Sequence, residues 1–135
     1  MNFDLSYFYA LVKDILTTPS PSGYTKAVVE KIQDYAMNLG LETEKSTKGN
    51  LIITFPGTDT SKTLGLSAHV DTLGLMVRSI NSDGTLRVTS IGGNQFMTLL
   101  GEYCLVHTRQ NKQYTGTVLS TAPASHVYEE CSKTG

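Results

Sequence analysis

The first forty residues have the apolar spacing of two amphipathic helices. Apolar side chains recur at every third or fourth position over residues 5–15, and Asp4 precedes them as a candidate N-cap. Residues 17–23 combine two prolines with hydroxyl side chains, which predicts a turn whose hydroxyls can cap the next helix. The helical spacing returns over residues 24–39, and Gly40 is well placed as the left-handed residue that ends a helix. We therefore expect two packed helices joined by a turn.

From residue 41 the spacing changes from helical to alternating, which is typical of strands. Residues 41–46 and 51–55 flank a Lys-Gly-Asn turn and predict a β-hairpin. After a polar connection, residues 64–68 form a short apolar segment without charge, which predicts a buried strand. This strand would end in the His-Val-Asp of residues 69–71. Because side chains alternate along a strand, the histidine and the aspartate are expected to share a face.

Beyond residue 71 the pattern consists of short strands and turns, without a helical period. Residues 73–80 and 85–91 predict a second hairpin, and residues 103–108 and 114–121 predict a third around a polar turn. Several short strands in succession favour a small barrel or sandwich.

The change of character after Asp71 predicts two modules. Residues 1–71 run helix, helix, strand, strand, strand, an order that permits an α/β module with a mixed sheet and flanking helices. Residues 72–135 are expected to form part of an all-β, barrel-like module. No closing element follows the last predicted strand, so we expect the chain to be cut short at this end.

Composition and charge exclude some classes of partner. The formal net charge of the 135 residues is −1 and no block of Lys or Arg occurs, which argues against nucleic acid or an anionic membrane as the main partner. The chain has neither a bilayer-spanning apolar run nor a secretory leader pattern, so a cytoplasmic location is expected. Cys104 and Cys131 fit neither a Cys-x-x-Cys site nor a disulfide framework, and we expect two reduced thiols.

The main candidate chemistry lies in His69 and Asp71, at the end of the apolar segment. Ligands bind at the carboxyl ends of strands in open α/β sheets. A neutral imidazole is a common metal ligand, and a nearby carboxylate can accept the proton of its other nitrogen and fix the orientation of the ring. Because His-x-Asp occurs often by chance, a histidine hydrogen-bonded at a strand end without metal remains the alternative.

Other candidate sites carry weaker signals. Residues 91–94, Ile-Gly-Gly-Asn, lack the strand-to-helix context of a phosphate-binding loop and predict a turn. His107 is expected to be a structural residue of its strand. Ser125 and His126 are adjacent in an extended segment without a third orienting group, which excludes a nucleophilic serine. The pair at 129–130, two glutamates, is expected to be solvated surface.

Six short motifs run in order along nearly the whole chain. They are Thr-Pro-Ser-Pro-Ser-Gly-Tyr at 18–24, Gly-Asn-Leu-Ile at 49–52, Ser-Ala-His-Val-Asp at 67–71, Leu-Gly-Leu-Met-Val at 73–77, Ser-Ile-Gly-Gly at 90–93 and Tyr-Thr-Gly-Thr-Val at 114–118. Together they resemble the amino-terminal part of the glutamyl aminopeptidase, or cellulase M-like, family of dinuclear metallo-aminopeptidases.

The resemblance implies a peptidase domain with a mixed sheet between helices, interrupted after the His-x-Asp strand by an inserted all-β module. By comparison with the family, both parts are expected to be incomplete in this chain. It implies that His69 is a ligand of one of two divalent metal ions, with zinc or cobalt suited to the site, and that Asp71 orients this ligand. The bridging aspartate, the glutamate pair that supplies the general base and a ligand, and the last aspartate and histidine ligands would lie beyond residue 135. Thr72 replaces a glutamate common there in many relatives, which leaves the subfamily and its substrate preference open.

The activity implied by the resemblance is metal-assisted release of amino-terminal residues from peptide substrates. A homo-oligomer is also implied, because several members form tetrahedral assemblies. One imidazole with one carboxylate cannot organise two ions, so we expect these 135 residues alone to be inactive. Two alternatives remain: a related co-catalytic metallo-exopeptidase, and a truncated or pseudo-enzymatic chain that acts as an assembly or binding module.

Overall fold

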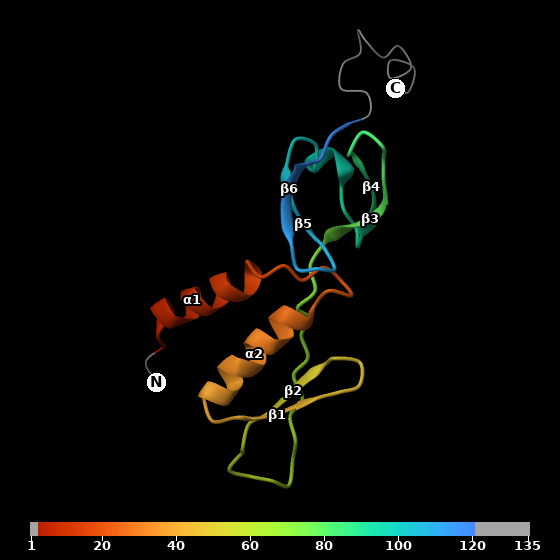
Figure 1. The fold of residues 1–135 in the computed structure, drawn as a ribbon. Helices are drawn as coiled ribbons and strands as arrows, with labels where there is room; N and C mark the ends of the chain where they lie inside the picture. Colours follow the sequence, from red (N-terminus) through yellow and green to blue (C-terminus); the bar gives the residue numbers. More distant parts are fainter. Residues whose placement is uncertain (1–2, 121–135) are drawn as a thin grey trace. The chain divides into compact units, whose positions relative to one another are not determined.

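The structure is a computed structural model that describes residues 3–120, and Figure 1 labels their helices and strands. By packing, the chain divides into two compact units after Asn94, which are described separately. The elements are α1 (Leu5–Leu16), α2 (Lys26–Asn38), β1 (Glu42–Lys45), β2 (Leu51–Thr54), β3 (Gly74–Ile80), β4 (Leu86–Ile91), the 3₁₀ helix η1 (Phe96–Thr98), β5 (Tyr103–His107) and β6 (Gln113–Thr117).

Helix α1 begins and ends with side-chain caps. The predicted N-cap is confirmed, because Asp4 Oδ1 accepts the backbone N–H of Tyr7 at 3.0 Å. At the other end, the Thr17 and Thr18 hydroxyls donate to the carbonyls of Lys13 and Asp14. These bonds satisfy carbonyls that have no partner within the helix. No residue of α1 is buried within the described part of the chain, so the face predicted to be buried is open here.

Helix α2 ends as predicted at Gly40, which has φ +73°. The Gly40 N–H donates to the Met37 carbonyl and the Leu41 N–H donates to the Ala36 carbonyl, which is the hydrogen-bond pattern of a Schellman motif. The buried apolar side chains among the described residues are Val28 and Ala36, both on α2. The small core of the first unit is therefore centred on this helix.

Polar contacts tie α2 to its neighbours. The Asp14 carboxylate of α1 accepts the Lys31 ammonium at 2.7 Å and the Tyr35 hydroxyl at 2.8 Å. On the other side, the Gln33 amide donates to the Thr43 hydroxyl of β1 at 3.1 Å. Strands β1 and β2 pair antiparallel as predicted, around a turn in which Gly49 has φ +85°.

The strand predicted over residues 64–68 is wrong. Residues 62–71 have no assigned strand, and Leu64 and Leu66 are 86% and 92% exposed. A strand needs a partner for its backbone groups, and the apolar pattern cannot show whether one lies alongside. After the β1–β2 hairpin, backbone pairing in the described residues resumes at Thr72, which forms an isolated parallel bridge with Pro21.

The predicted mixed sheet is also not found in the described residues. They contain three separate two-stranded antiparallel sheets, one for each predicted hairpin. The β3–β4 hairpin packs within the first unit, where the Asn94 amide donates to the Gly74 and Ile91 carbonyls and to the Ser90 hydroxyl. The packing units thus divide at a different residue from the predicted domain boundary after Asp71, which stays a prediction.

The second unit, as far as residue 120, contains η1 and the β5–β6 hairpin. The hairpin was predicted, whereas η1 was missed because three residues are too short to show a helical period. Cys104 of β5 is a free thiol, as expected. The predictions for residues 125–126 and 129–131 lie outside the described residues.

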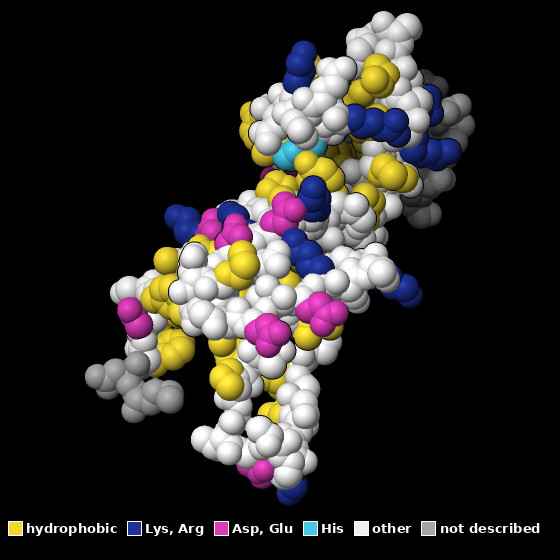
Figure 2. Space-filling view, turned by 60° about the horizontal axis from the view of Figure 1, so that its bottom comes forward, with side chains coloured by type: hydrophobic (Ala, Val, Ile, Leu, Met, Phe, Trp, Pro, Cys, Tyr) yellow, Lys and Arg dark blue, Asp and Glu magenta, His cyan; other side chains and the backbone are white. Residues whose placement is uncertain are grey.

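Hydrophobic side chains reach the surface at many places on the face that Figure 2 shows. By exposed fraction, the hydrophobic side chains on or beside α1 that are 65–70% exposed are Phe3, Tyr9 and Leu16. Over residues 3–120, no helix has the length and apolar character needed to cross a membrane.

Candidate metal site

His69 and Asp71 lie within hydrogen-bond distance of each other. The Nδ1 atom of His69 is 2.9 Å from Asp71 Oδ1 and 3.2 Å from the backbone carbonyl of Asp71. The expected proximity of this carboxylate to the ring is therefore confirmed, although the pair stands on a loop segment and not at the end of a strand. When the ring proton is on Nδ1, it is donated to the carboxylate, and the lone pair of Nε2 is available to bind a metal ion.

Asp71 is held from its other side by a residue far away in the sequence. The Ser22 hydroxyl donates to Asp71 Oδ2 at 2.5 Å, across 49 positions of the chain. Each oxygen of the carboxylate thus has its own partner, Ser22 on one side and His69 on the other.

The turn that carries Ser22 is fastened to the backbone around Asp71. The Ser20 hydroxyl donates to the Val70 carbonyl at 2.8 Å, and the Thr72 N–H donates to the Ser20 carbonyl at 2.9 Å. Ser20 is only 1% exposed. This doubly bonded, buried serine anchors the turn beside residues 70–72.

The local sequence explains why the two segments can approach. Pro19 and Pro21 restrict φ on both sides of Ser20, and Gly23 adopts φ +87°, which turns the chain toward α2. At Gly74 an added Cβ would lie 2.6 Å from the Cβ of Pro21. The close contact of these segments therefore requires a residue without a side chain at position 74.

Two serines in this arrangement were missed as site residues from sequence. The hydroxyls of residues 17–23 were expected to cap α2, but Ser20 and Ser22 bond to residues 70–71, and the side chain of the N-cap Thr25 makes no capping bond. Periodicity carries no sign of a contact over such a separation. The only indication was that both segments belong to motifs shared with the family.

The surroundings favour the ionised form of Asp71. Hydrogen bonds from Ser22 and from His69 lower the pKa of this carboxyl below its ordinary value, against a smaller opposing effect of desolvation. The Asp71 side chain is 42% exposed and that of His69 is 85% exposed, so the ring is accessible to a ligand. An ionised, anchored carboxylate can hold the imidazole in one orientation.

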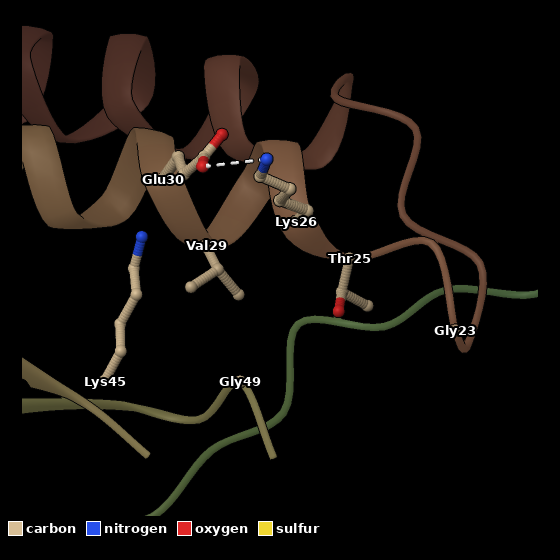
Figure 3. Close-up of a pocket in the computed structure, with 7 residues that line it drawn as sticks. All are labelled: Gly23, Thr25, Lys26, Val29, Glu30, Lys45 and Gly49. Carbon is tan, nitrogen blue, oxygen red and sulfur yellow. Dashed lines mark ion pairs between the residues drawn. The ribbon is translucent and has the colours of Figure 1, made fainter. Parts of the chain in front are cut away.

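A shallow pocket of about 270 Å³ lies elsewhere in the first unit, between the start of α2 and the β1–β2 turn. Figure 3 shows Val29 pointing from α2 toward Gly49, and Lys26 paired with Glu30 at 3.7 Å. The lining of the pocket includes neither His69 nor Asp71, and its one carboxylate, that of Glu30, is paired with Lys26. This pocket is therefore not a metal site.

His69 and Asp71 fit one ligand position of a metal site. An imidazole whose Nδ1 is bonded to a carboxylate is the usual arrangement of a metal-binding histidine. Within residues 3–120 no group of three or more His, Cys, Asp or Glu side chains could hold an ion. The described part of the chain thus offers one candidate imidazole ligand, His69, with Asp71 bonded to its ring.

Comparison with known proteins gives a consistent family. Residues 49–135 match the model of the M42 glutamyl aminopeptidase family. YhfE of Bacillus subtilis, named as an aminopeptidase, is 43% identical over 91% of this chain and 36% of its own length. The chain thus spans about a third of the length of this relative.

Solved structures agree in fold. Aminopeptidase APDkam598 from the archaeon Desulfurococcus kamchatkensis superposes with a TM-score of 0.82 at 28% identity, over 91% of this chain and 34% of that one. PhTET1-12s, solved with a dodecamer in the asymmetric unit, gives a TM-score of 0.65 at 26% identity, over 85% of this chain and 33% of that one. The order of motifs, the fold and the family match lead to one conclusion: this chain belongs to the M42 glutamyl aminopeptidase family.

Proposed function

We propose that the protein carrying this chain is a metal-dependent aminopeptidase in which His69 binds one of two divalent metal ions. The observation that carries the proposal is the pairing of His69 Nδ1 with Asp71 Oδ1. Because Nδ1 faces the carboxylate, Nε2 on the far side of the exposed ring points away from Asp71. Family membership supports the reaction class, hydrolysis of amino-terminal residues from peptides.

The described residues have defined parts in this chemistry. Two bound ions would polarise the scissile carbonyl and lower the pKa of a water. His69 would supply an imidazole ligand through Nε2, and Asp71 would keep the ring proton on Nδ1 and orient the ring. Asp71 suits this part because a carboxylate is ionised at neutral pH, and its hydrogen bonds from Ser22 and His69 lower its pKa further.

Predictions about the metal, the location, the assembly and the domains extend this proposal. Zinc or cobalt suits a site of imidazole and carboxylate ligands. We propose a cytoplasmic location and a homo-oligomer, and the dodecamer of the similar PhTET1-12s structure supports the oligomer. We also propose a mixed sheet in the complete peptidase domain, with residues 1–71 in that domain and 72–135 in an inserted barrel-like β domain. The proposed boundary is supported by the elements described over residues 72–120, which are strands apart from the three-residue η1.

The test compares the full-length protein with the chain of residues 1–135. Each is loaded with zinc or cobalt and assayed for release of amino-terminal residues from short peptides. Metal-dependent release by the full-length protein is expected, and it should be abolished by His69→Ala but retained by His107→Asn, a change in β5. The shorter chain should be inactive. Inactivity of the metal-loaded full-length protein would refute the proposal and favour a non-enzymatic assembly module.

A further inference from the structure

We propose that Ser22 is a positioning residue for the metal site, because its hydroxyl fixes the Asp71 carboxylate that orients His69. The role of the metal in this inference rests on the proposed function. The geometry that carries the inference does not, since it is the continuous chain of hydrogen bonds from Ser22 through Asp71 to His69.

One hydrogen bond would not fix the carboxylate of Asp71. Rotation about the terminal bond of an aspartate is broad, and this side chain is 42% exposed, so water competes for its oxygens. The bond to His69 engages only Oδ1, and the ring itself is 85% exposed. A second bond on Oδ2 defines the plane of the carboxylate and keeps Oδ1 directed at Nδ1. Ser22 makes that bond.

The position of Ser22 is itself fixed by its neighbours in the turn. Ser20 bonds to residues 70 and 72 through its hydroxyl and its carbonyl, and Pro21 pairs with Thr72. The turn, held by these bonds, therefore places the Ser22 hydroxyl beside the carboxylate. Ser20 holds the turn, whereas Ser22 acts on the carboxylate, so mutation can separate anchoring from positioning.

A merely structural Ser22 and a positioning Ser22 make different predictions for metal binding. A structural serine would change the stability of the protein and leave its affinity for metal intact. A positioning serine changes metal affinity and the geometry of the ligand, and its effect is restored by another side chain with a hydroxyl at the same place. The variants are Ser22→Ala, Ser22→Thr and, as a matched control, Ser82→Ala, an exposed serine of the β3–β4 turn.

The experiment uses the full-length protein and Co²⁺ alone as the probe. Affinity is measured by competition with a chelator, and the ligand geometry by the visible absorption of bound cobalt. Ser22→Ala should weaken Co²⁺ binding by about 3- to 10-fold, at or below the lower end of the range for outer-shell partners, and change the absorption. Ser22→Thr and Ser82→Ala should resemble the wild type. Unchanged affinity and absorption in Ser22→Ala would overturn the inference.

Crystal structures of the metal-free proteins give a second readout that does not depend on metal. Asp71 Oδ1 should remain bonded to His69 Nδ1 in the wild type and in Ser22→Thr, and the carboxylate should rotate away in Ser22→Ala. If the wild type binds no cobalt, the proposed function fails, and these structures still decide the role of Ser22. A carboxylate that keeps its place in Ser22→Ala would show that Ser22 does not position it.

Discussion

At the residue scale, the site depends on the hydrogen bonds that the two oxygens of one carboxylate accept. In Asp71, Oδ1 bonds to His69 and Oδ2 bonds to Ser22, and both bonds favour the ionised form of the side chain. The sequence predicted the contact between Asp71 and His69, because these residues lie two positions apart and form a visible His-x-Asp pattern. It could not predict the serine, because the contact depends on how the chain folds back over 49 positions.

Replacing Asp71 with asparagine should weaken metal binding by about 10- to 100-fold, because a neutral amide makes the imidazole less basic and orients it less firmly. Zinc affinity of the full-length protein, measured by chelator competition, checks this. Asp83→Asn is the matched control, because Asp83 also has a lowered pKa from bonds to its neighbour Thr85 but lies in the β3–β4 turn. Equal affinity in Asp71→Asn and the wild type would contradict the orienting role.

The contact between α1 and α2 should depend on pH at both extremes. The bonds from Lys31 and Tyr35 lower the pKa of Asp14 below 3.8, so their stabilisation is complete above that value and is lost as the pH falls through the lowered pKa. The bond to Asp14 also raises the pKa of Tyr35 above 10.0, so the Tyr35 contribution is lost only as the pH rises through that raised pKa.

Resistance of α1 to a pulse of protease, measured across pH, checks this. We expect resistance to be constant between about pH 5 and 9 and to fall in acid below the ordinary pKa of aspartate. In Asp14→Asn the fall in acid should be smaller, because the titrating group is absent. An identical acid profile in this variant would contradict the assignment.

At the element scale, sequence predicted what neighbouring residues determine. The Asp4 cap, the Gly40 end of α2 and the turns of the three hairpins follow from local residue preferences, and the structure confirms them. The error at residues 64–68 has the opposite cause. An apolar run indicates that a segment is suited to burial, but it does not show whether a neighbouring strand is present to pair with it.

Gly74→Ala should separate the turn at 19–23 from residues 70–72, because the new Cβ would lie 2.6 Å from the Cβ of Pro21. We expect a loss of about 1–3 kcal/mol in unfolding free energy, as for other overpacked sites. Hydrogen exchange of the Thr72 amide, which is bonded to Ser20, should become faster. Gly65→Ala is the control, since an added Cβ there would meet no atom within 4 Å. Equal exchange of Thr72 in both variants would contradict this account.

At the scale of the whole molecule, the chain is about a third as long as the relatives it matches. Its buried apolar side chains among the described residues are Val28 and Ala36, whereas Leu64 and Leu66 are almost fully exposed. A large exposed apolar surface is typical of a face that another part of the protein or another subunit covers. That the chain is incomplete stays a prediction from the family's further ligands, and the exposed segment is what this prediction leads us to expect.

The chain of residues 1–135 on its own should therefore associate. Light scattering should show concentration-dependent oligomers or aggregates, and Leu64→Lys combined with Leu66→Lys should reduce them. Lys substitution at Thr58 and Thr60, exposed polar positions before the same segment, is the control for added charge. A monodisperse monomer at high concentration would contradict the expectation.

Anomalous scattering from crystals of the full-length protein loaded with zinc tests whether His69 binds a metal ion through Nε2 while Asp71 holds Nδ1. We predict a zinc peak about 2.0–2.1 Å from His69 Nε2. We also predict a second peak about 3.5–4 Å from the first, with Asp71 Oδ1 still bonded to Nδ1. Zinc bound at other residues with none at His69, or zinc on Nδ1 in place of the Asp71 bond, would contradict the account.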